Sequence, residues 1–315
     1  MATQATVAPR YFLASTFVCL LLVVFQTHPL AAQQTKQTSK PKPSAAPALW
    51  VIADEDTTLY LFGFAPVLKR GTQWKTDMVT KALNTASLMV VESDGTAPQA
   101  QSAIQTLIPK IGLNGGGSKL SNLLTEDQRT ELETVVTPMK VPLSALEPLK
   151  PWLASVQLGV LSVSRGGYDL ENPPSTALIK QAKAAGITVS ALEEPITLMK
   201  LMASFSEDEQ VGMLMHTVHT LRNHPDQQLQ LSKAWLAGDV KEVGKILHSR
   251  DGAWASEEVY DAMLVQRNTA WVAKIKRLMT EHKGTVFLSV GLGHLAGKDS
   301  LIRMLQDDGW AVRRK

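Results

Sequence analysis

The 315-residue sequence contains a single cysteine, Cys19, and it lies inside an N-terminal apolar run. From residue 33 onward the chain has no cysteine, so neither a disulfide nor a thiolate nucleophile is available to the rest of the protein. An excess of one charge is also missing, because 32 Lys and Arg residues face 29 Asp and Glu residues and leave a formal charge of +3. We therefore expect no nucleic-acid partner.

Long apolar runs are scarce as well. The stretch after Arg10, YFLASTFVCLLLVVF, is shorter than the roughly 20 residues of a membrane-spanning helix. Small residues follow it up to Ala32, so we predict a signal peptide at residues 1–32, with an uncleaved anchor as the alternative. Residues 33–47 are rich in Lys, Pro, Ser and Gln, which predicts a flexible linker. The protein is thus expected to be periplasmic or secreted, with no membrane span after cleavage.

The remaining chain, residues 48–315, reads as one domain that alternates between extended and helical patterns. β-branched and aromatic residues predict a hairpin of strands 50–53 and 57–62. Apolar runs predict further strands, and 3.6-residue periodicity predicts helices between them. The strands are expected at 88–91, 187–192, 284–290 and 309–314, and the helices at 77–86, 97–111, 176–185, across most of 195–282, and at 301–307.

Two of these strands end in carboxylates: LMVV leads into Glu92, and ITVSAL leads into Glu193. In α/β proteins, functional side chains gather in the crevice at the carboxyl ends of the strands. The predicted fold class is therefore α/β (mixed α+β), built from strand-helix units with sites at strand C-termini and a large helical insertion.

The strongest local signal is VFLSVGLGHLAG, in which a buried strand runs into Gly291-Leu292-Gly293-His294. Glycines permit a sharp turn, so we expect His294 to project from the carboxyl edge of the strand. A histidine there suits metal binding or general-base chemistry, and a residue that only caps the turn is the alternative.

Five segments, in this order and at these separations, resemble the TraB/GumN family, which is related to the Tiki-type metalloproteases. They are LYLFGFAPVLKRGTQW, LMVVESD, SALEE, LVQRNTAWVAKI and VFLSVGLGHLAG. The resemblance covers the chain from about Ala48 to the C-terminus. It implies a fold of the erythromycin-esterase/ChaN-like group and a peptidase activity that depends on a divalent metal, manganese or cobalt.

The resemblance also implies a site made of two GxxH motifs and a glutamate. The glutamate corresponds to Glu92 and the second histidine to His294, so both are candidate catalytic and metal-binding residues. The first motif falls on Gly63-Phe64-Ala65-Pro66, where Pro66 stands in place of the histidine. Because proline has no side-chain lone pair, we expect metal binding to be weakened or lost. A third ligand could come from Asp54, Asp56 or Asp94.

Three further candidates have structural alternatives. Arg267 belongs to an RN pair shared with the family, and it is a candidate catalytic residue that orients Glu92 or binds an anionic group, or else ties its helix to the sheet. Glu193 is a weaker site candidate, since SALEE has Ala191 where the family has glycine. His216 and His219 share a helix face, which suits chelation, but both border an apolar stripe and are expected at a solvated helix margin. The scattered Trp235, Trp254 and Trp271 are expected to be packing residues, with sugar-stacking platforms as the alternative.

Two functions follow. The first is an exported, metal-dependent hydrolase or peptidase that acts on a peptide or polymer and has a degenerate first motif. The second is a non-catalytic binding or accessory protein of the cell envelope, linked through the GumN resemblance to exopolysaccharide. Pro66 favours the second function, whereas Glu92 and His294 favour at least a retained pocket.

Overall fold

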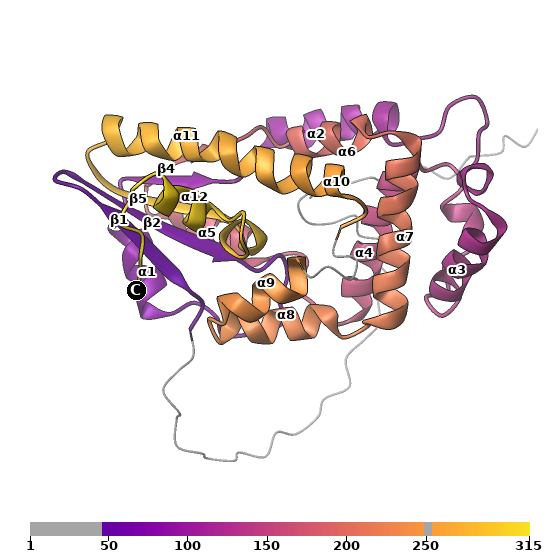
Figure 1. Cartoon of the computed structure of the whole chain (residues 1–315), viewed down its shortest axis with the longest axis horizontal. Helices are drawn as coiled ribbons and strands as arrows, with labels where there is room; N and C mark the ends of the chain where they lie inside the picture. The colour runs from indigo at the N-terminus through magenta and orange to yellow at the C-terminus, as the bar shows by residue number, and fades with distance from the viewer. Residues whose placement is uncertain (1–45, 249–253) are drawn as a thin grey trace, which may run out of the picture.

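The structure, a computed structural model, describes residues 46–248 and 254–315. It is a mixed α/β fold around a six-stranded sheet of order β4-β3-β5-β2-β1-β6 (Figure 1). The strands are β1 (Leu49–Ala53), β2 (Thr57–Phe64), β3 (Leu88–Val91), β4 (Thr188–Ala191), β5 (Gly284–Gly291) and β6 (Arg313–Arg314). The predicted mixed α/β class is confirmed. The predicted signal peptide and the predicted linker up to residue 45 lie outside the described residues.

Four neighbouring strands of the sheet, β4, β3, β5 and β2, run parallel to one another. The predicted hairpin is present, with β1 antiparallel to β2 and Leu49 opposite Phe62. The closing strand is shorter than the predicted 309–314, because β6 pairs with β1 only at Arg313 and Arg314. Trp310 and Val312 instead pack against a hydrophobic cluster that includes Trp50 of β1 and Leu288 of β5.

Helices cover both faces of the sheet, as Figure 1 shows for α1 on one side and α11 on the other. One face packs on α1 (Asp77–Asn84), α5 (Pro174–Ala184), α8 (Gln227–Leu236) and α9 (Val240–His248). The other packs on α11 (Gln266–Glu281) and α12 (Leu301–Asp307). Strand β5 is buried on both faces, with Phe287 in the first cluster and Val286 and Leu288 in the second. This two-sided burial is why its sequence is a continuous apolar run.

The other helices extend the molecule beyond the sheet, where α3, α4 and α7 form a separate group (Figure 1). The helices are α2 (Pro98–Ile111), α3 (Glu126–Val136), α4 (Pro151–Arg165), α6 (Thr197–Ser204), α7 (Glu207–Asn223) and α10 (Glu257–Tyr260), with short 3₁₀ turns η1 (Leu120–Leu123) and η2 (Leu143–Ala145). Thr125 and Ser206 begin α3 and α7 through capping boxes with Gln128 and Glu209. The predicted large helical insertion is confirmed between β4 and β5. Within the two described ranges, no helix combines the length and the apolarity needed to cross a membrane.

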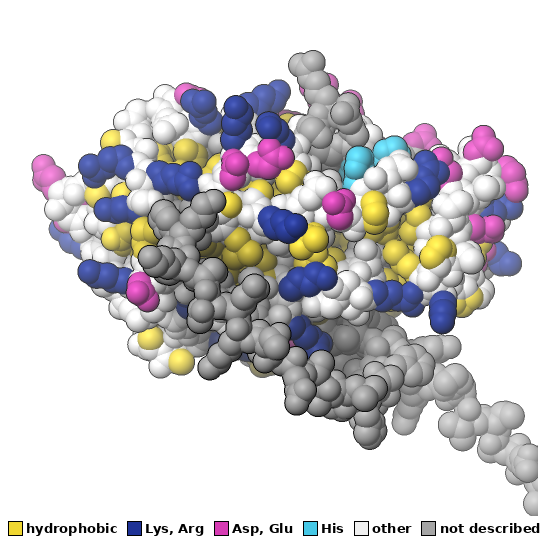
Figure 2. Space-filling model, turned by 90° about the horizontal axis from the view of Figure 1, so that it is seen from below, with side chains coloured by type: hydrophobic (Ala, Val, Ile, Leu, Met, Phe, Trp, Pro, Cys, Tyr) yellow, Lys and Arg dark blue, Asp and Glu magenta, His cyan; other side chains and the backbone are white. Residues whose placement is uncertain are grey.

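Side chains of both charges lie on the face of the molecule that Figure 2 shows. On the face shown in Figure 2, lysine and arginine side chains are spread over the molecule and lie among apolar and acidic ones. This agrees with the small formal charge of +3. Several lysine and arginine side chains lie close together along the upper left edge of this view, with acidic side chains nearby.

Candidate functional site

The carboxyl ends of the four parallel strands bring the candidate residues to one edge of the sheet. Val91 lies beside Ala191 on one side and beside Ser289 on the other, and Phe64 lies beside Gly291. The segments that follow these strands therefore emerge together. Across the edge, in strand order, they carry Glu193, Glu92, His294 and Pro66.

The three aspartates that could have supplied another ligand are not available to this edge. Asp54 and Asp56 lie in the turn before β2, at the opposite end of that strand from Phe64. Asp94 is paired with Lys183, whose Nζ lies 2.8 Å from its Oδ2. Burial raises the pKa of Asp94, but the bonds from Lys183 and Thr96 outweigh it, so the net pKa lies below its usual value.

Arg267, on α11, is the centre of the site. Its Nη2 lies 2.6 Å from Glu92 Oε1 and 2.5 Å from Glu193 Oε1, and its Nε donates to Glu193 Oε2 at 3.2 Å. Its Nη1 lies 3.3 Å from His294 Nε2. The side chains of Arg267, Glu92 and Glu193 are only 10%, 16% and 10% exposed. One planar guanidinium thus joins the ends of three strands.

Local structure fixes the direction of the Arg267 side chain. The π-helical turn η3 (Asp261–Val265) interrupts the helix just before α11, and Arg267 Nη1 donates to the Met263 carbonyl at 3.0 Å. The guanidinium carbon also lies 4.7 Å from the centre of the Trp271 ring, one turn further along α11. Arg267 is therefore held by its own helix as well as by the carboxylates.

The glycines of the two motifs are explained by close contacts. A side chain at Gly291 would place its Cβ 3.3 Å from Glu92 Oε2, the atom that accepts a hydrogen bond from the Gly291 N–H at 3.0 Å. A Cβ at Gly63 would lie 3.1 Å from Leu292 Cα, in the 3₁₀ turn η4 (Leu292–Leu295). Glycine at these positions lets Glu92 and the η4 turn approach the strand ends.

His294 lies at the carboxyl edge, but the prediction that it projects outward is wrong. It is 7% exposed, because Trp271 packs against its ring with centroids 4.4 Å apart and Asn268 closes the other side. Asn268 Nδ2 donates to the Asp299 carbonyl, so its Oδ1 faces His294 Nδ1 at 2.7 Å and must accept. Nδ1 therefore carries the proton, and the Nε2 lone pair faces Arg267.

Burial and neighbouring charges separate the acid-base behaviour of these groups. Burial lowers the pKa of His294 to about 4; Arg267 acts in the same direction, and Glu92 opposes it. Burial raises the pKa of Glu92, but His294, Arg267 and the Gly291 N–H lower it more. Burial raises the pKa of Glu193 above its usual value, and Arg267 only partly offsets this. Near neutral pH the site therefore holds a neutral histidine beside an ionised Glu92.

The divalent metal implied by the resemblance does not fit these residues. His294 Nε2, Glu92 Oε1 and both Glu193 oxygens all face the Arg267 guanidinium, so a second cation would meet a fixed positive charge. Pro66 is exposed and offers no lone pair. Within residues 46–248 and 254–315, no three His, Cys, Asp or Glu residues are grouped so that they could hold a metal ion.

The other candidate histidines and tryptophans lie outside the site; His219 is exposed and His216 is half-buried on α7, as expected for a solvated helix margin. His219 bonds to Asn223 on α7, a helix that packs in the separate helical group. Trp235 donates to the Gly63 carbonyl at 2.6 Å inside the core, and Trp254 stacks on His248. Trp271 alone of the three named tryptophans contacts the site.

Three site residues were not identified from the sequence. Asn268 sets the tautomer of His294, and its place beside Arg267 in the RN pair was the available signal. Trp271 supports both Arg267 and His294 and is one turn away on the same helix, so helical spacing could have indicated it. Ser289 lines a pocket beside Glu92, but it lies inside an apolar strand, where no sequence pattern marks it as a site residue.

Comparison with known proteins agrees with the pattern of these motifs. The model of the TraB/PrgY/gumN family matches residues 48–314. No curated protein and no solved structure matches the chain. The family match includes every residue of the site at the strand ends, from Pro66 to His294, and nearly the whole described fold. The chain therefore belongs to the TraB/PrgY/gumN family.

Proposed function

We propose that this family member is exported and acts as a non-catalytic binding or accessory protein of the cell envelope. The observation that carries the proposal is the simultaneous contact of Arg267 with Glu92, Glu193 and His294. These are the side chains that a hydrolytic site would need free. The Arg267 guanidinium binds them instead, and the result is a rigid, largely buried network at the carboxyl ends of the strands.

The acid-base chemistry of the network supports this reading. A general base needs an accessible lone pair within hydrogen-bond reach of the proton that it removes. Glu92 has one oxygen bonded to Arg267 and the other to the Gly291 N–H. His294 is neutral, but its Nε2 lone pair faces Arg267. The Arg267 guanidinium and the Gly291 N–H stabilise the ionised form of Glu92, and Arg267 faces Nε2 of His294, so both groups are weakened as bases toward water.

Hydrolysis is the second candidate, and one observation favours it. Asn268 accepts a hydrogen bond from the Nδ1–H of His294 and leaves Nε2 as the acceptor, and a metal-ligating histidine is typically held in this way. There His294 and Glu92 would hold the metal, which would supply Lewis-acid chemistry. This candidate requires Arg267 to leave its present position.

Calorimetric titration of the purified protein with Mn²⁺ or Co²⁺ separates the two candidates. We expect no saturable micromolar binding by the wild type, because Pro66 cannot act as a ligand and Arg267 neutralises the carboxylates. The Pro66→His variant restores the motif histidine and is expected to bind at least tenfold more tightly. Tight binding by the wild type that is abolished by His294→Ala would contradict the proposal and support hydrolysis.

Export is supported by the apolar run after Arg10 and the small residues that end at Ala32. We expect protein recovered from the envelope or the medium to begin at Gln33, as N-terminal sequencing would reveal. A full-length chain in the cytoplasmic fraction would contradict export. The resemblance further suggests an erythromycin-esterase/ChaN-like fold group and a polymer partner such as an exopolysaccharide, and both remain parts of this proposal.

A further inference from the structure

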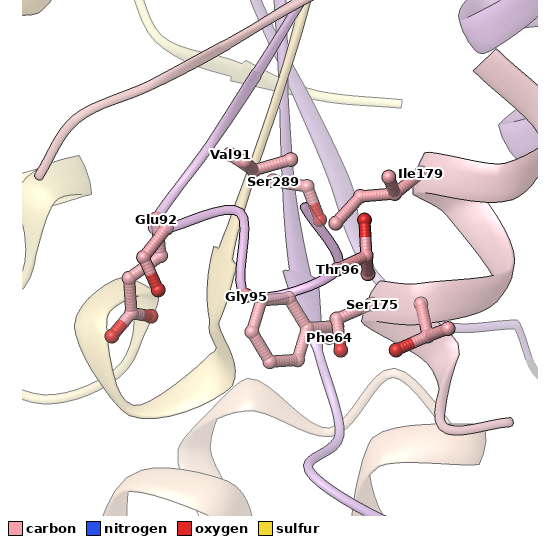
Figure 3. Close-up of a pocket in the computed structure, with 10 residues that line it drawn as sticks. Phe64, Val91, Glu92, Gly95, Thr96, Ser175, Ile179 and Ser289 are labelled. Carbon is pink, nitrogen blue, oxygen red and sulfur yellow. The ribbon is translucent and has the colours of Figure 1, made fainter. Parts of the chain in front are cut away.

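A small cavity lies beside Glu92, on the side of the sheet that carries α5. It has a volume of about 30 Å³, and its walls come from the ends of β2, β3 and β5 and from the start of α5 (Figure 3). Five of its lining residues carry hydroxyl groups: Ser93, Thr96, Ser175, Thr176 and Ser289. Phe64 supplies an aromatic surface, and Val91 and Ile179 complete the apolar wall. We call this cavity the hydroxyl pocket.

Ser289 gives the first sign that the hydroxyl pocket takes a ligand. Its side chain is 1% exposed, and its Oγ has no hydrogen-bond partner among the described residues. Figure 3 shows this oxygen pointing toward the space between Val91, Ile179 and Thr96. A buried hydroxyl without a partner loses its hydrogen bonds to water, so such groups are rare unless something else satisfies them.

The N-terminus of α5 gives a second, independent sign. Ser175 and Thr176 lie in its first turn and line the pocket. The N-cap residue is Pro173, which makes no side-chain cap bond, and the first turn contains no acidic residue. The first N–H groups of a helix have no partner inside the helix, so those of Ser175 and Thr176 are donors at the pocket wall. A ligand here would accept hydrogen bonds from the N–H groups of α5, and it could form a hydrogen bond with the Ser289 hydroxyl as donor or acceptor.

Charge and size limit the class of ligand. Glu92 lines the same pocket and is ionised, which disfavours an anion despite the helix terminus. Arg267 already balances the charge of Glu92, with its Nη2 2.6 Å from Oε1, which disfavours a second cation beside it. A water needs roughly 10–15 Å³ of such space, so about 30 Å³ accommodates one small group and not a whole ring.

From the orphaned Ser289 hydroxyl and the uncapped α5 terminus we propose that the hydroxyl pocket binds the hydroxymethyl group of a neutral polyol, such as a sugar. The hydroxyl oxygen accepts from the α5 N–H groups, and its proton is donated to a pocket oxygen. The methylene packs on Phe64 and Ile179, and the rest of the molecule lies outside the pocket. This inference rests on the proposed binding function and gives it a ligand class.

Solution NMR of the full chain, with chelator present and glycerol or glucose as the probe, tests the inference. We expect saturable shifts of the amide signals of Ser175, Thr176 and Ser289, and no such shifts with acetate or methylammonium. Ser289→Ala should weaken binding at least tenfold, and it should also raise the denaturant midpoint because it removes an unsatisfied hydroxyl.

The matched control is Ser232→Ala, at a buried serine outside the pocket whose Oγ donates to the Gln228 carbonyl at 2.8 Å. It should lower the midpoint and leave probe binding unchanged. Absence of probe shifts in the wild type would overturn the inference and indicate that ordered water alone fills the pocket. Equal or stronger binding of acetate would also overturn it. The chelator excludes metal, so either result contradicts only the ligand class inferred here. The proposed non-catalytic function is contradicted by the metal titration instead.

Discussion

Replacement of Arg267 by methionine is expected to lower the free energy of unfolding by about 3–5 kcal/mol. Methionine keeps much of the apolar stem over Trp271 but removes every charged donor. Glu92 and Glu193, whose side chains are 16% and 10% exposed, would then face each other without a counter-charge. Removing one partner of a buried ion pair costs far more than the pair contributes, because the remaining charge stays desolvated.

Two comparisons isolate this effect in denaturant unfolding. Arg277→Met removes an exposed pair with Glu281, 3.8 Å apart, and should change stability by at most about 1 kcal/mol. The triple variant Arg267→Met, Glu92→Gln, Glu193→Gln should recover most of the loss, since it leaves no buried charge. A small loss for Arg267→Met alone would show that water or a shift of α11 compensates the carboxylates, and the network would then not be rigid.

The sequence was sufficient to place the site at an edge but not to describe its interior. Glu92 and Glu193 follow apolar strands, and parallel strands end on the same side, so their meeting could be predicted. The contact of Glu193 with Arg267 could not be predicted, because Arg267, which joins both carboxylates, is far away in the sequence. Long-range pairing of this kind leaves no periodic signal.

The burial of His294 illustrates the same limit. Two glycines indicate a turn, and a turn usually exposes its side chains, yet α11 lies across this one and covers it with Trp271. Ser289 is a further case, since alternation along a strand buried on both faces does not distinguish a packed serine from one that faces a cavity. Pro66, in contrast, could be interpreted directly, because its chemistry excludes a ligand in any conformation.

Lowering the pH from 7 to 5 is expected to cost the wild type about 2 kcal/mol of stability through His294 alone. Its pKa is about 4 in the folded protein and about 6.5 when unfolded. The unfolded chain therefore binds more protons than the native one throughout this window, so the free energy of unfolding rises with pH. The stabilisation is complete above about pH 6.5 and is lost progressively toward pH 4. Burial against Trp271 and the charge of the Arg267 guanidinium both disfavour protonation of the His294 ring.

Denaturant titrations at pH 7 and pH 5 measure this contribution as a difference between the wild type and His294→Gln. The half-buried His216 and His248, whose pKa values desolvation also lowers, are present in both proteins and cancel. The window stops at pH 5 because Glu92, with its lowered pKa, loses its charge only below the usual carboxyl range. Direct NMR titration should show the His294 ring neutral at pH 5. Equal pH dependence in the two proteins, or a ring that titrates near pH 6.5, would mean that His294 reaches solvent in the native state. The Asn268 contact would then not fix its tautomer, and the neutral histidine in the site would lose its structural basis.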